Sequence, residues 1–231
     1  MSYRLPEALS ADDDATAVAH LRTYYGVGGG EPYTGGRFDS WRGNDPSRFT
    51  ADDVVAVSFL SVFVPPQAVA ELLDTQADRF AELLVAVGPD RDLVDETGPV
   101  DPSWPAWRLY SAVRGLGGIG PTIASKLLAR KRPRLLPIYD SVVDQVTNAG
   151  EAQWEPLRLA LRSGGSGTLH ARLERLRTAA GLDESIPALR VYDVVTWMEG
   201  KDANLRPTTQ EEQLGAELAD SPEEDLPEQD T

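Results

Sequence analysis

The chain has 231 residues, of which 41% are hydrophobic and 26% charged, and its formal net charge is −15. This composition is typical of a globular protein that can bury a core, and the absence of cysteine excludes disulfides, thiolate metal sites, iron–sulfur clusters and a cysteine nucleophile. The sequence lacks the basic and apolar regions of a signal peptide and any apolar run of roughly 18 residues. We therefore expect a cytoplasmic protein with no membrane partner.

Short segments with helical periodicity alternate with proline and glycine along the chain, which predicts an all-α fold of about nine helices. Thr50 and Asp53 have the spacing of a capping box, and Pro66 suits the first turn of a short helix. The longer predicted helices cover residues 12–25, 51–63, 76–87, 104–114, 122–132, 141–147, 151–162, 168–180 and 187–199.

The charges are unevenly distributed. Residues 207–231 contain nine acids and no Lys or Arg, so we predict a disordered acidic tail over 204–231. The rest has 22 basic and 28 acidic residues, a net charge of −6. Five basic residues fall within residues 126–134. Such a cluster either forms a positive patch that binds phosphate or belongs to a solvated helix face and loop.

Residues 104–132 carry the most informative pattern, two predicted helices joined by Gly118-Ile119-Gly120. Glycine tolerates positive φ, so Gly118 and Gly120 are expected to let the chain reverse sharply, with Ile119 turned into the core. The N–H groups at the start of the second helix are suited to a phosphate oxygen. The expected nucleic-acid contacts are Gly118, Gly120 and Thr122, with Lys126, Arg130 and Lys131 facing outward.

Residues 116–143 resemble the helix-hairpin-helix region of the DNA glycosylase superfamily that includes endonuclease III-like and adenine-mismatch enzymes. That family reads Leu-Pro-Gly-Val-Gly-x-x-Thr-Ala across the hairpin. Gly117 and Ile123 stand where the family has proline and threonine. The matching residues are Leu116, Gly118, Ile119, Gly120 and Ala124.

The resemblance implies that Asp140 is the catalytic carboxylate, because the family places an aspartate at the start of the helix after the hairpin. Asp140 lies 18 residues beyond Thr122, which stands where bifunctional members carry their Schiff-base lysine. The implied enzyme is therefore a monofunctional DNA N-glycosylase. Val142 replaces a histidine of the family pattern, and the iron–sulfur loop of some members is absent. The implied fold packs a hairpin half, residues 50–140, against a terminal half made of residues 1–49 and 141–203.

The whole chain also resembles an uncharacterised bacterial family of unknown function. This resemblance rests on the hairpin, the Tyr139-Asp140-Ser141 segment and the ending Trp197-Met198-Glu199-Gly200-Lys201. It implies no activity.

The residues allow two interpretations of Asp140. A carboxylate at a helix start stays ionised, and it can stabilise an oxocarbenium-like sugar or activate water once a base has been extruded into a pocket. Alternatively, Asp140 is only an N-cap, with Ser141 and Asp144 forming a capping box.

Three further residues are pocket candidates. Tyr139 can stack on a base or belong to the core. Asp193 lies in an apolar run, where it either pairs with an arginine such as Arg190 or lines a pocket. Trp197 follows Asp193 by one helical turn and shares its face.

The hairpin thus predicts a nucleic-acid-binding protein, and the resemblance implies double-stranded DNA as its partner and monofunctional DNA glycosylase-like chemistry. A non-catalytic nucleic-acid binder and a protein-interaction domain are the alternatives. We expect no cofactor, because the segment from Gly26 to Glu31 lacks the third glycine and the preceding strand of a dinucleotide fingerprint. We expect no metal, because His20 and His170 lack ligand spacing.

Overall fold

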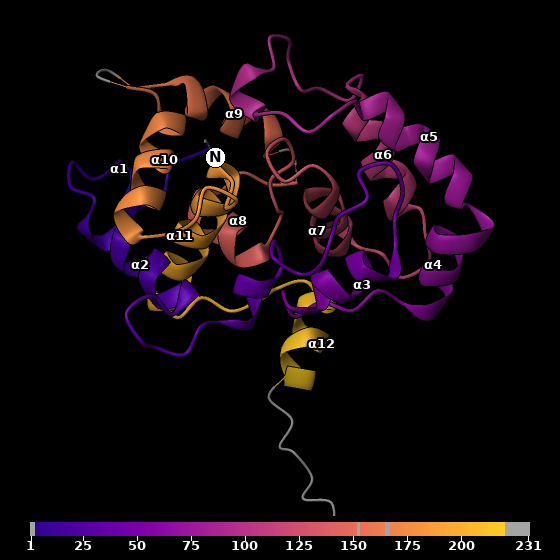
Figure 1. The fold of residues 1–231 in the computed structure, drawn as a ribbon, viewed down its shortest axis with the longest axis horizontal. Coiled ribbons are helices and arrows are strands. Elements are labelled where there is room, and N and C mark those ends of the chain that lie inside the picture. The colour runs from indigo at the N-terminus through magenta and orange to yellow at the C-terminus, as the bar shows by residue number, and fades with distance from the viewer. Residues whose placement is uncertain (1–2, 152, 165–166, 220–231) are drawn as a thin grey trace, which may run out of the picture.

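The structure is a computed structural model that describes residues 3–151, 153–164 and 167–219, and every regular element in these ranges is helical. The all-α prediction is therefore confirmed. Figure 1 shows one group of helices around α2, α10 and α11 and another around α3 to α7, with α7 and α8 near the centre. Within the described residues, no helix is long and apolar enough to cross a membrane.

The first group consists of helices from both ends of the chain. Its members are α1 (Glu7–Ser10), α2 (Ala15–Tyr25), α8 (Ser141–Thr147), α9 (Trp154–Arg162), α10 (Leu169–Ala180) and α11 (Ala188–Asp202). Helix α11 is almost entirely buried and packs against α1, α2, α8 and α10. Its contact with α8 is close, since a Cβ added to Gly200 would lie 2.3 Å from Val142 Cγ1.

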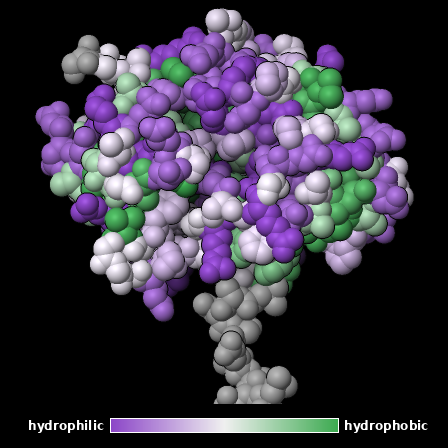
Figure 2. Space-filling view, viewed as in Figure 1, coloured by the Kyte–Doolittle hydropathy of each residue, from purple (hydrophilic) through white to green (hydrophobic). Residues whose placement is uncertain are grey.

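The second group comes from the middle of the chain. Its members are α3 (Ala51–Ser58), α4 (Pro66–Ala70), the π-helical turn η2 (Glu71–Thr75), α5 (Ala77–Val87), α6 (Pro105–Arg114) and α7 (Pro121–Lys131). The 3-10 turns η1 (Thr34–Arg37) and η3 (Leu93–Asp95) lie in connecting loops. One continuous hydrophobic core contains side chains of both groups. Hydrophilic residues predominate on the face shown in Figure 2.

The start of α3 forms as the sequence predicts, but its end does not. Thr50 N donates to Asp53 Oδ2 at 2.8 Å, and the reciprocal bond completes the capping box. The helix ends at Ser58 rather than near residue 63, and the chain turns over residues 59–61. Ser61 has φ 56°, a left-handed conformation that cannot continue a right-handed helix.

The predicted hairpin is present between α6 and α7, but only one of its two glycines needs positive φ. Gly118 is exposed with φ 77°, and an added Cβ would lie 2.8 Å from Pro65 Cγ. Gly120 has φ −94° and ψ −173°, an extended conformation open to other residues. Ile119 is 6% exposed and belongs to the core, as predicted.

The boundary of the predicted disordered tail needs correction. Helix α12 (Gln210–Ala219) follows the loop after α11 and packs against α7. It also lies against the turn after α3, because a Cβ added to Gly215 would lie 1.7 Å from Ser61 O. The side chain of Glu212 is buried. The rest of the predicted tail, residues 220–231, lies outside the described residues.

Candidate functional site

A cavity of about 410 Å³ is lined by both groups of helices and by the start of α12. Its walls come from α2, the loop around η1, the turn after α3, α7, the segment leading into α8, and α11. The volume lies within the range of small-molecule sites, roughly 300–1,000 Å³. The cavity brings together Asp140, Asp193, Trp197 and Lys126, four of the residues singled out in the sequence.

One wall of the cavity is aromatic. The rings of Tyr24 and Tyr33 are stacked, with centroids 5.5 Å apart and an interplanar angle of 10°. Trp197 meets both rings edge-on, at 6.0 Å from Tyr24 and 5.4 Å from Tyr33. Lys201 Nζ lies 5.5 Å from the centroid of Trp197. A flat ring in the cavity can pack against these faces and edges.

Asp140 lies at the N-terminus of α8 as its N-cap. Val142 N donates to Asp140 Oδ1 at 2.9 Å, which leaves Oδ2 directed at Lys126 Nζ, 3.5 Å away. The capping box expected from Ser141 and Asp144 is replaced by this bond, and Ser141 Oγ instead accepts from Thr208 N at 2.9 Å. Asp140 therefore serves as a cap, contacts Lys126 and lines the cavity.

Two further charged residues surround Asp140. Lys126 is 3% exposed, and its Nζ also donates to Leu60 O at 3.0 Å. Glu212, from α12, accepts from Ser141 N at 3.0 Å and from the Thr209 hydroxyl. Two carboxylates thus share one buried cation.

Burial and the neighbouring charges shift the pKa values of Asp140 and Glu212. Burial, reinforced by the charge of Glu212, raises the pKa of Asp140 to about 6, although Lys126 opposes the shift. Burial alone would also raise the pKa of Glu212. Lys126 and the bonds from Ser141 and Thr209 outweigh burial, and they hold the pKa of Glu212 below its usual value. Asp140 is therefore the carboxyl of the pair that takes up a proton more readily.

Asp193 belongs to a buried ion pair and also lines the cavity, so both alternatives considered for it are observed. Its Oδ2 accepts from Arg190 Nη1 at 2.6 Å and from Ile138 N at 3.4 Å. Arg190 is held in turn by Asp39, at 2.7 and 3.2 Å, and lies over the Phe38 ring. Burial raises the pKa of Asp193 to about 7, against the opposing charge of Arg190.

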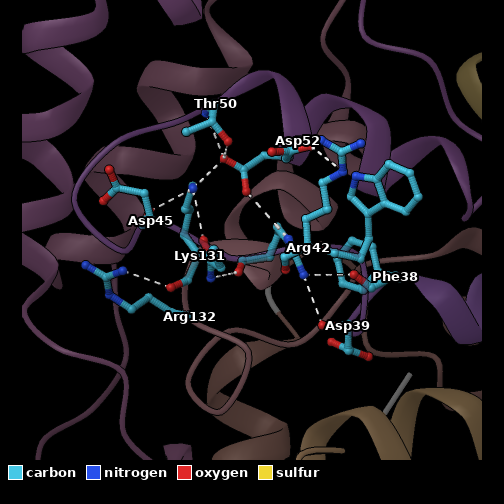
Figure 3. Close-up of polar contacts among 12 residues, drawn as sticks. Phe38, Asp39, Arg42, Asp45, Thr50, Asp52, Lys131 and Arg132 are labelled. Carbon is cyan, nitrogen blue, oxygen red and sulfur yellow. Dashed lines mark hydrogen bonds and ion pairs between the residues drawn. The ribbon is translucent and has the colours of Figure 1, made fainter.

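The basic residues predicted to face outward are buried, and that prediction is wrong. Lys126, Arg130 and Lys131 are 3%, 4% and 1% exposed. Figure 3 shows the amino group of Lys131 directed towards Asp45 and the start of α3. This cluster does not form the expected positive surface patch.

The cations at the end of α7 bind carbonyl oxygens and one buried acid. Arg130 donates to the carbonyls of residues 38, 39, 41 and 42, and Lys131 donates to Asp45 O at 2.9 Å. Arg132 donates to Pro46 O at 2.8 Å. Lys131 Nζ also pairs with the fully buried Asp53 (Figure 3). These cations hold the loop 38–46 in place.

Of the other residues predicted to contact nucleic acid or a base, some lie at the surface and some in the interior. Gly118 is exposed and Gly120 half-buried at the hairpin. Thr122 is fully buried, so its side chain is not on the surface expected for a phosphate contact. Tyr139 is 9% exposed and does not line the cavity. This position agrees with the core interpretation of Tyr139.

Sequence reasoning missed Glu212, Lys201 and the two tyrosines of the aromatic wall. Glu212 was counted among the acids of a disordered tail. Thr209 and Glu212 nevertheless have the Thr-x-x-Glu spacing of a capping box, a local signal for a helix at this point. Tyr24 and Tyr33 flank a glycine-rich loop, and no local pattern places their rings beside Trp197.

These features define an all-α protein with an aromatic-walled cavity into which three carboxyl groups and a buried lysine converge. Residues 17–200 match the Family of unknown function (DUF6308), and because this stretch is most of the chain, the protein belongs to that family. No curated protein and no solved structure matches the chain.

Proposed function

We propose that the protein is an N-glycosylase-like hydrolase that takes a planar base into the cavity and uses Asp140 as its catalytic carboxylate. The observation that carries this proposal is the position of Asp140 at the N-terminus of α8, where its carboxylate contacts Lys126 and the residue lines an aromatic-walled cavity. The α6–α7 hairpin followed by an aspartate at the next helix start is also the arrangement of helix-hairpin-helix DNA glycosylases.

The chemistry requires a group that accepts a proton from water near neutral pH. As the bond between the base nitrogen and the anomeric carbon breaks, its electron pair leaves with the base. The water oxygen bonds to the anomeric carbon, and the water proton moves to Asp140 and then to solvent. The departing base nitrogen takes up a proton from solvent, so that the products are the neutral base and the sugar hydroxyl. A carboxyl with a pKa of about 6 is ionised at neutral pH and is basic enough for this role. The negative charge also stabilises the oxocarbenium-like sugar.

Lys126 supports the same step through Asp140. Its ammonium lies 3.5 Å from Asp140 Oδ2 and is fixed by Leu60 O. This contact favours the ionised form of the buried carboxylate, because a nearby cation opposes the effect of burial on the pKa.

The base could be carried by DNA or by a smaller molecule. The predicted basic cluster is buried, so its residues give little support to tight binding of a DNA backbone. Double-stranded DNA remains one candidate carrier of the base, beside single strands and free nucleosides. All three contain the same N-glycosidic bond.

The test is release of free base, measured by liquid chromatography and mass spectrometry. The full chain would be incubated with nucleosides, single strands and duplexes that carry normal, deaminated, alkylated or oxidised bases. Asp140→Asn keeps the oxygen that caps α8, so folding should survive. Base release should fall by about 10² or more, because removing a positioned acid or base typically costs 10²–10⁴-fold.

Asp144→Asn is the matched control, because Asp144 belongs to the same helix but does not line the cavity. This variant should release base as the wild type does. Equal activity of Asp140→Asn and wild type would reduce Asp140 to a helix cap. If the wild type releases no base but binds nucleic acid, the protein is a non-catalytic binding domain.

A further inference from the structure

The rim of the cavity differs in chemistry from its interior. The described residues that line the cavity and are exposed comprise two cations, two hydroxyl side chains and one aromatic ring. They are Lys201, Arg206, Thr34, Ser61 and Tyr33. The acids of the lining are buried or half-buried, and they are Asp140, Asp193 and Glu212. The exposed charges of the cavity lining are therefore both positive.

No described acid compensates either of these cations. Within the part of the chain that the structure describes, the side chains of Lys201 and Arg206 have no ion pair and no hydrogen bond. Asp202, the neighbour of Lys201, contacts His20 at 3.0 Å and does not line the cavity. Acids are abundant in this chain, with 37 against 22 basic residues. Two uncompensated cations at one cavity attract an anion.

These cations lie close to the aromatic wall. Lys201 follows Trp197 by one turn of α11, and its Nζ lies 5.5 Å from the centroid of the Trp197 ring. Arg206 is in the loop that follows α11, and the Ser61 hydroxyl lines the same cavity from the turn after α3. A nucleotide combines a flat ring with an anion whose oxygens accept from ammonium, guanidinium and hydroxyl donors.

The number of exposed cations favours a small ligand over a polymer. A phosphate monoester carries a charge of about −1.5 to −2 near neutral pH, which two cations at the rim can compensate. A nucleic-acid strand is bound instead through many phosphate contacts. The chain has a net charge of −15, and four of its clustered basic residues are buried, namely Lys126, Arg130, Lys131 and Arg132. Repulsion from the acidic chain therefore opposes a long strand more than a single phosphate.

We propose that Lys201 and Arg206 bind the phosphate of a nucleoside monophosphate whose base packs against the aromatic wall. The substrate of the cavity is then a free nucleotide, rather than a nucleoside or a nucleic-acid strand. This inference rests on the proposed function, because it names the substrate class of the same cavity. The rim cations hold the phosphate, and Asp140 acts at the glycosidic bond.

The proposal is tested by isothermal titration of the full chain with C-nucleosides, whose carbon–carbon glycosidic bond resists hydrolysis. Formycin A and pseudouridine are each compared with their own 5′-monophosphate, and pseudouridine is also compared with a single-stranded oligonucleotide that contains it. At low ionic strength the monophosphate of at least one pair should bind about tenfold more tightly than its nucleoside. The difference should shrink as salt screens the exposed cations. The oligonucleotide should bind no more tightly than the monophosphate.

Two double variants assign the effect to the rim. Lys201→Gln with Arg206→Gln removes both positive charges and keeps polar side chains at exposed positions, so folding should survive. This variant should bind each nucleoside and its monophosphate equally. Arg108→Gln with Arg175→Gln is the matched control, because both residues are exposed cations that do not line the cavity. The control should keep the preference for the monophosphate.

Equal affinity within both pairs, or no binding of any probe, would overturn the inference. A preference that survives in the variant of the rim, or tighter binding of the oligonucleotide, would also overturn it. Base release at equal rates from N-nucleosides and their 5′-monophosphates would overturn the inference while the proposed function stands. A preference for the monophosphate without release of any base would support the inference and contradict the proposed function.

Discussion

Raising the pH from 5 to 8 should destabilise the protein, and Asp193→Asn should remove most of that effect. In the folded chain the pKa of Asp193 is raised to about 7 and that of Asp140 to about 6, from an ordinary value of 3.8. A group whose pKa is raised by folding contributes stability that is fully present below its unfolded pKa. That contribution is lost as the pH rises through the folded pKa.

The two pKa values set the size of the effect. Between pH 5 and 8, linkage gives a loss of about 3 kcal/mol from Asp193 and about 1 kcal/mol from Asp140. For a chain of this length, each kcal/mol changes the melting temperature by about 2–4 °C. The Asp193 contribution is therefore about 6–12 °C. Glu212, whose pKa is lowered, adds stability that is lost only at more acidic pH.

The assay is urea denaturation and thermal melting of wild type and Asp193→Asn at four pH values and constant ionic strength. The difference between the two proteins cancels the general repulsion of an acidic chain. Asp183→Asn is the control, because the pKa of Asp183 is lowered by bonds from Ser185 and Asp183 does not titrate in this window. If the free energy of unfolding changes with pH equally in wild type and Asp193→Asn, then Arg190 keeps Asp193 ionised from pH 5 to 8. That result would refute the reasoning.

Two further predictions concern stability. Lys131→Met leaves Asp53 buried with one cation fewer and should lower the free energy of unfolding by about 3–5 kcal/mol, measured by urea denaturation. Arg48→Met, which removes one partner of an exposed ion pair, is the control. An equal effect of the two substitutions would contradict the structural role of Lys131. Ending the chain at Arg206 removes α12 and Glu212, which should lower the melting temperature and move the Asp140 titration to lower pH. A chain ending at Ala219 retains α12 and is the control. An unchanged melting temperature after the shorter truncation would mean that α12 does not pack as described.

The hairpin could be predicted because its signals are local. Glycine and proline fix backbone conformations within a few residues, so the turn around Gly118 and the start of α7 follow from the sequence. The N-cap role of Asp140 is local in the same sense.

The direction of the α7 cations could not be predicted, because their partners are distant in sequence. Lys131 is buried against Asp53 of α3, and Arg130 is buried against carbonyls of the loop 38–46. No periodicity in α7 distinguishes a lysine that meets solvent from one that meets such partners. Glu212 was missed for a related reason. A count of acids predicts disorder, whereas this one acid has Ser141 and Lys126 to compensate its charge.

The contacts that hold the loop 38–46 determine which sequence changes this loop can accept. Most of them are made by Arg130, Lys131 and Arg132 to main-chain oxygens, which every amino acid supplies. Exchanging side chains in the loop therefore leaves most of these bonds intact. Inserting or deleting one residue would move the carbonyls away from the positions where these cations bind them. The loop thus tolerates changes of composition better than changes of length.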